Sequence, residues 1–185
     1  MFRLFKKNAP KNAPKNAPVD RDILFYGILA TTIDKIQDYY LNGIAGSTPI
    51  KDVKKTEVVI FAIILVKTAI NGFSLTQKTA EQDALNLLIA GVKYISGNVE
   101  ADERTILGVI LRREDEYYPV IYAEMVDRQE GSFVVPQIGA LLDSHVLLVE
   151  ADDDAIDASC RSLGIQASFL AAIEAVELVY SGKLG

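Results

Sequence analysis

Residues 58–66, VVIFAIILV, are the most apolar stretch of the chain. A helix that is apolar all round has to be buried all round, because every exposed face would place hydrocarbon in water. Extended to Ile70, the stretch is still shorter than the roughly 20 apolar residues that cross a bilayer. It therefore predicts the central helix of a soluble helical bundle, with an interrupted or re-entrant membrane segment as the alternative.

The sequence on either side of this stretch is also helical in pattern. Apolar residues recur at helical spacing, capping residues precede them, and glycine-containing pairs follow them. Asp20 is the expected cap of the first helix, Thr56 of the second, and Ser74 with Gln77 has capping-box spacing for the third. The predicted helices cover residues 20–42, 56–72, 74–97, 136–149 and 155–181, with Gly164 as a candidate break in the last.

Helix and strand compete over residues 104–138. Ile106 to Leu111 keep helical spacing, and Pro119 suits a first helical position, which predicts one helix ending before Pro119 and another beginning there. The β-branched and aromatic residues of 117–126 also fit a strand. We favour helices, and so a mainly α bundle of six or seven helices. The alternative is an α+β fold with a hairpin in 104–138.

The chain divides into a basic tail, residues 1–18, and an acidic helical domain, residues 19–185. Residues 7–18 read KNAP three times, and each proline favours extended geometry in the residue before it. The tail holds five Lys or Arg and no acidic residue, whereas the rest of the chain holds 14 basic and 25 acidic residues. We expect a disordered tail that joins a cationic peptide to an acidic body.

Charge and cysteine content narrow the class of protein. A sequence pI near 4.9 disfavours nucleic acid, because Lys and Arg supply most of the affinity for phosphate. An acidic body instead suits a protein partner with a basic surface. One cysteine, Cys160, excludes an internal disulfide and fits a reducing compartment. We expect a cytoplasmic protein in a bacterium-like setting, with the inner face of the membrane as the alternative location.

Motifs for metal or nucleophilic chemistry are incomplete. His145 is the only histidine, so the Glu-x-x-His pairs of di-iron bundles and the ligand sets of zinc sites are missing. Residues 152–154, three aspartates, suit the start of a helix better than a calcium loop. Cys160 and His145 are candidates for a nucleophile and base, but both fit a buried core. We expect no metal, no cofactor and no enzymatic activity.

Two groups of residues are candidate contact sites. Tyrosine and arginine dominate the energetics of protein interfaces, and both are concentrated in one short stretch. This candidate interaction set is Arg112, Arg113, Glu114, Tyr117, Tyr118 and Tyr122. The amphipathic peptide at the start of the chain is a candidate for weak contact with an anionic membrane surface, at about 1 kcal/mol per basic residue. This second set is Phe2, Arg3, Leu4, Phe5, Lys6 and Lys7.

These features predict a non-catalytic interaction protein, such as an adaptor, an inhibitor or an immunity-type partner of a basic surface. The alternative is a peripheral membrane component tethered by its basic N-terminal peptide. A small enzyme of unknown reaction is the third hypothesis.

Overall fold

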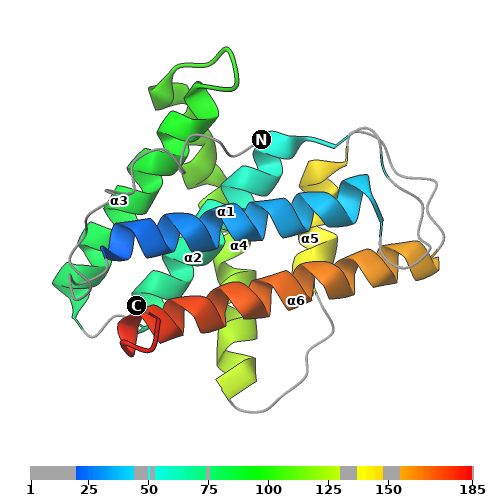
Figure 1. The fold of residues 1–185 in the computed structure, drawn as a ribbon. Coiled ribbons are helices and arrows are strands. Elements are labelled where there is room, and N and C mark those ends of the chain that lie inside the picture. Colours follow the sequence, from blue (N-terminus) through cyan, green and yellow to red (C-terminus); the bar gives the residue numbers. More distant parts are fainter. Residues whose placement is uncertain are drawn as a thin grey trace, which may run out of the picture.

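The computed structural model describes residues 20–43, 50, 53–73, 76–129, 137–147 and 155–184. These ranges contain six helices and no strand (Figure 1). The helices are α1 (Arg21–Leu41), α2 (Lys55–Phe73), α3 (Gln77–Ser96), α4 (Glu103–Gln129), α5 (Gln137–Val146) and α6 (Ala155–Tyr180). An isolated antiparallel bridge joins Val53 to Leu147. The prediction of a mainly α bundle is confirmed.

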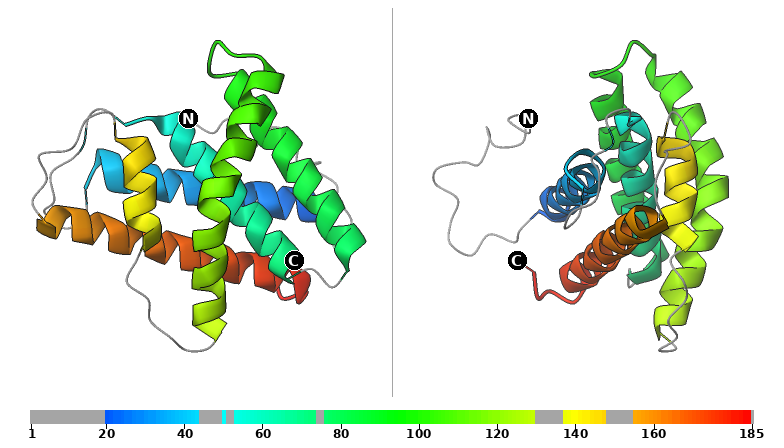
Figure 2. Two further views of the ribbon diagram at one scale, coloured as in Figure 1. Left: turned by 180° about the vertical axis from the view of Figure 1, so that it is seen from behind. Right: turned by 90° about the vertical axis from the view of Figure 1, so that its right-hand side faces the viewer.

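Helix α2 lies at the centre of the bundle and contacts each of the other five helices. Its residues 58–66 are all buried, as their composition predicted. On one side of α2, α1 and α6 run antiparallel to each other (Figures 1 and 2). On the opposite side lies α4, whose backbone does not pack against α1 or α6 in the described residues. One side-chain contact reaches it from α6, since the Gln166 amide donates to Glu124 (3.4 Å). The bundle therefore has three layers, α1 with α6, then α2 with α3 and α5, then α4.

Two helices, α2 and α6, are long and apolar enough to cross a membrane by length and composition. In the fold, 67% of the apolar window of α2 and 44% of that of α6 are buried. A core helix passes the same test of length and composition, and the five neighbours of α2 make it such a helix. The outward part of α6 is less completely covered.

Local capping chemistry fixes several helix ends. The Asp20 carboxylate accepts a hydrogen bond from the Asp22 amide (3.0 Å) at the start of α1, as expected. Helix α3 is capped by Thr76, whose hydroxyl accepts from the Thr79 amide (3.2 Å), and Ser74 lies outside the described residues. Asp102 accepts hydrogen bonds from the amide and hydroxyl of Thr105 at the start of α4, and these bonds lower the pKa of its carboxyl.

Helix α4 corrects two predictions for residues 104–138. It is continuous from Glu103 to Gln129 with Pro119 inside it, so neither a helix boundary at Pro119 nor a hairpin strand is found in that span. Pro119 is exposed, so its ring faces outward while Tyr117 and Ile121 remain buried on the inner face. The cost of one missing backbone hydrogen bond is thus offset by an inner face that is buried along the helix.

The expected break at Gly164 is also wrong, because α6 runs without interruption through this residue. Gly164 is buried, so the glycine lies at a packed position of the helix rather than at a turn. The end of α6 does follow the prediction, since Gly182 adopts a positive φ of 68° just beyond it. The tail, residues 1–18, with its candidate membrane contacts, lies outside the described residues.

Candidate functional site

Helix α4 forms one of the two outer layers of the bundle (Figure 2). Its two faces differ in burial. The inner face buries Ile106, Ile110, Tyr117 and Ile121 against the rest of the protein. The outer face is exposed along the charged and aromatic stretch of the sequence. The candidate interaction set, which was defined from composition, is divided between these two faces.

Two members of the set bind α4 to the central helix. Arg113 donates to both carboxylate oxygens of Glu57, from Nε (3.0 Å) and Nη2 (3.1 Å), and also to Glu116 (3.1 Å). The bonds to Glu57 raise the pKa of the Arg113 guanidinium. Glu114 accepts from Lys67 Nζ at 2.6 and 2.7 Å. These charge-assisted contacts fix the rotation of α4 about its own axis.

Tyr117 lies beneath these ion pairs and is fully buried. Its ring packs edge-on against Phe61 (centroids 5.3 Å apart) and against His145 (5.5 Å). Its hydroxyl has no hydrogen-bond partner among the described residues, and burial raises the pKa of the phenol. Tyr117 therefore belongs to the core, which corrects its assignment to an interaction surface.

His145 contacts α4 from α5. Its Nε2 atom lies 2.7 Å from Glu116 Oε2, within ion-pair distance, although the two groups are not aligned for a hydrogen bond. In the described part of the chain, no hydrogen bond joins His145 to Cys160, which is half-buried on α6. The structure thus places the histidine in the packing between α4 and α5.

The outer face of α4 brings together three residues of the set, Arg112, Tyr118 and Tyr122. Tyr118 and Tyr122 are 41% and 53% exposed, and their rings are stacked with centroids 5.8 Å apart. A hollow of about 300 Å³ lies beside Tyr118 and is lined by Glu114, Asp115, Tyr118 and Pro119. We call this surface the tyrosine face. Its members are Leu111, Arg112, Asp115, Tyr118, Pro119 and Tyr122.

Three members of the tyrosine face were not in the predicted set, namely Leu111, Asp115 and Pro119. The spacing of 111, 115, 118 and 122 follows one stripe of a continuous helix. That signal was present in the sequence. It was hidden by the expectation that a helix ends before Pro119.

A second polar cluster lies where α1, α5 and α6 meet. Asp143 accepts from the Tyr40 hydroxyl (2.5 Å) and from Arg161 Nη2 (2.9 Å), and the guanidinium carbon of Arg161 lies 5.6 Å from the centroid of the Tyr40 ring. Burial and the Asp143 carboxylate raise the pKa of Tyr40 far above its ordinary value. Tyr40 and Arg161 are both buried, so this cluster is well suited to hold three helices together.

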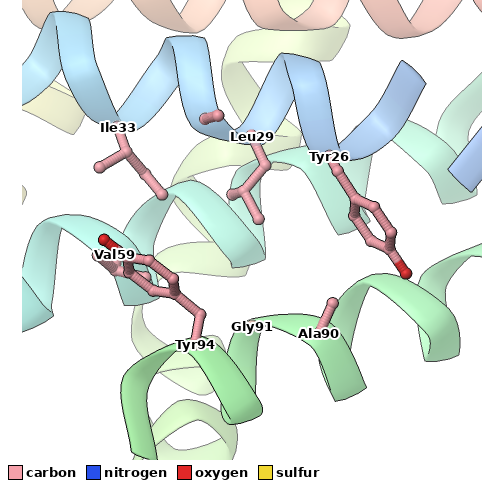
Figure 3. A pocket seen from close by; sticks show the side chains of 8 residues that line it. Tyr26, Leu29, Ile33, Val59, Ala90, Gly91 and Tyr94 are labelled. Atoms are coloured by element: carbon pink, nitrogen blue, oxygen red, sulfur yellow. The ribbon is translucent and has the colours of Figure 1, made fainter. Parts of the chain in front are cut away.

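Within the described part of the chain, the remaining candidate sites lack the residues or the space to bind a metal ion or a ligand. No group of three or more potential metal ligands occurs in the described ranges, and Asp152–Asp154 lie outside them. A cavity of about 20 Å³ between α1, α2 and α3 is shown in Figure 3. Its lining is almost entirely apolar, including Leu29, Ile33 and Val59, and Gly91 lies at its wall. Such a small apolar space is a packing gap rather than a ligand site.

Comparisons with protein-family models, with curated proteins and with solved structures give no match for this chain. The site is therefore interpreted from its own geometry.

Proposed function

We propose that this protein is a non-catalytic protein–protein interaction module that binds its partner through the tyrosine face of α4. The observation that supports this most directly is the stacked, exposed pair Tyr118–Tyr122 on a helix held in place from beneath. Exposed aromatic residues on the same helix as an exposed arginine, Arg112, have the composition of interface hot spots.

Preorganisation strengthens this argument. Tyr118 and Tyr122 are one turn apart, so each ring limits the motion of the other before any partner arrives. The ion pairs of Arg113 and Glu114 and the buried ring of Tyr117 hold the helix under them. Ordering flexible side chains is a main cost of binding, at about 0.5–1.5 kcal/mol per side chain. A face that is already ordered avoids part of that cost.

The charge of the chain indicates the kind of partner. Residues from 19 onward hold 14 basic and 25 acidic residues, so their net charge is strongly negative. Such a field accelerates encounters with a positively charged protein and disfavours polyanions. An adaptor, inhibitor or immunity-type role toward a basic protein fits this field, with the tyrosine face supplying the contact.

The test is affinity capture from native lysate with the full chain and a Tyr118→Ala/Tyr122→Ala variant. If the tyrosine face binds the partner, the variant should bind at least about 30-fold more weakly, as expected when a hot spot worth at least 2 kcal/mol is lost. Leu163→Ala is the matched control, because Leu163 is a similarly exposed apolar residue on α6. Circular dichroism verifies that each variant is folded.

A partner retained equally by the double variant and by the control would refute docking at this face. Salt dependence tests the charge argument separately. The association rate with the captured partner should fall steeply between low and physiological ionic strength. A rate that does not change with salt would remove the basic-partner part of the proposal and leave the tyrosine face untouched.

A second candidate function, attachment to a membrane surface, is favoured by α6, which is apolar enough to cross a membrane and less than half buried. The basic residues of the tail would supply attraction to anionic lipid. In that case, deleting residues 1–18 should abolish sedimentation with vesicles that contain phosphatidylserine. The Tyr118→Ala/Tyr122→Ala variant should sediment normally, which separates this function from the first.

A further inference from the structure

A groove of about 430 Å³ runs between α1 and α6 on the side of the molecule away from α4. Seven residues of α1 between Ile23 and Lys35 form one wall, and four residues of α6 between Ser168 and Ala175 form the other. The α6 wall consists of serine and alanine, so small side chains leave the space open. Leu184 closes the end nearest the start of α1.

No close contact among the described residues requires a glycine at position 27, which lies in this groove. A Cβ atom built on it would meet nothing within 4 Å. A glycine inside a helix makes the helix less stable than an alanine would. A glycine that faces open space therefore lowers stability, although an alanine would fit at the same position. Gly108 on α4 is equally open, so the glycine alone does not imply an occupant, but at Gly27 the open space lies in the groove and lets an occupant approach the α1 backbone.

We propose that the N-terminal head of this chain, residues 1–7, docks in the α1–α6 groove. The head contains three large apolar residues, Phe2, Leu4 and Phe5, which match an apolar groove. It also carries three basic and no acidic residues, whereas α1 and α6 together carry three basic and six acidic residues. The charged residue in the groove lining is Lys35, which is basic, so the complementary negative charge lies on the two helices around the groove. The apolar content of the head matches the lining itself.

The length of the connection permits this docking. The described chain begins at Asp20, one turn before Ile23 at the end of the groove. The middle of the groove, at Gly27, is about 10 Å along α1 from that point at 1.5 Å per residue. Residues 8–18 span up to about 34 Å at 3.1 Å per residue in extended geometry. The spacer is thus about three times longer than the direct path, which leaves length for the chain to reverse direction.

The test uses limited trypsin digestion of the full chain under single-cut conditions. Cleavage after Arg3 and Lys6 reports on the head, and cleavage after Lys11 and Lys15 reports on the spacer of the same molecule. Each rate is divided by the rate for a synthetic peptide of residues 1–19. A docked head should be cut at least about threefold more slowly than the spacer, because proteolysis follows the population of the open state.

Gly27→Leu fills the groove and should remove this protection, bringing the head and spacer rates together. Gly108→Leu is the matched control, since Gly108 is also an exposed helical glycine with open space around its Cβ position, but it lies on α4. Both substitutions favour the helix, so both variants should fold. Protection should persist in the control.

Three outcomes would overturn the proposal. They are equal head and spacer rates in the natural chain, protection that survives Gly27→Leu, and protection that disappears on hundredfold dilution. The last would assign the groove to the head of a second copy, because contacts within one molecule do not depend on concentration.

Discussion

At the scale of single residues, the two fully buried tyrosines Tyr40 and Tyr117 differ in the hydrogen bonding of their hydroxyl groups. The Tyr40 hydroxyl donates to the Asp143 carboxylate, whereas the Tyr117 hydroxyl has no hydrogen-bond partner among the described residues. A hydrogen bond to a charged group contributes about 1.5–3 kcal/mol, and an unsatisfied buried hydroxyl costs about 1–3 kcal/mol. The same chemical change therefore has opposite expected effects at the two positions.

Tyr40→Phe should lower the free energy of unfolding by about 1.5–3 kcal/mol, because the half-buried Asp143 carboxylate loses a donor. Tyr117→Phe should leave the free energy unchanged or raise it by about 1 kcal/mol, because no bond is lost. Urea unfolding of both variants at pH 7 measures the two values. A large loss of stability in Tyr117→Phe would mean that its hydroxyl is hydrogen-bonded in solution.

At the scale of elements, the sequence predicted helices well where their ends carry their own chemistry. Asp20, Gly97 and Gly182 mark the ends of α1, α3 and α6, and each acts through atoms within a few residues of it. The continuity of α4 could not be predicted this way. It depends on which side of the helix Pro119 faces, and that is decided by contacts with α2 and α5.

The candidate site was predicted in part for the same reason. Composition identified the stretch around Tyr118, but it could not show that Arg113 and Glu114 point inward. Their direction follows from Glu57 and Lys67, which are 56 and 47 residues earlier in the chain. Only the helix packing brings these partners within reach.

Pro119→Ala tests the account of α4. Alanine supplies the N–H that Asp115 O lacks and relieves the clash of the proline ring with that carbonyl. The free energy of unfolding should rise by about 1–3 kcal/mol, because proline inside a helix costs about 3 kcal/mol relative to alanine. Denaturant unfolding measures the change, and Ala123→Gly, at another exposed position of α4, should shift stability the opposite way by about 1 kcal/mol. A destabilised Pro119→Ala protein would contradict a continuous helix at this point.

At the scale of the whole molecule, the buried tyrosines link stability to pH. Burial raises the pKa of both Tyr40 and Tyr117 above the ordinary value of 10.0. The unfolded chain ionises these phenols near pH 10, while the folded chain keeps them protonated. Above pH 10 the unfolded state therefore holds fewer protons, and stability falls as pH rises. Below pH 10 both states are protonated and the contribution of these groups is constant.

Each of the two tyrosines should contribute a loss of about 1.4 kcal/mol per pH unit above pH 10. Tyr117→Phe should thus reduce the slope of unfolding free energy against pH by about 1.4 kcal/mol per unit between pH 10 and 11.5, with little change at pH 7. Tyr118→Phe, at the exposed neighbour, is the control and should keep the slope of the natural protein. Guanidinium unfolding at half-unit pH steps measures all three slopes. An unchanged slope in Tyr117→Phe would show that water reaches this ring, and the packing of α4 onto Phe61 and His145 would then be looser than the closed contact described above.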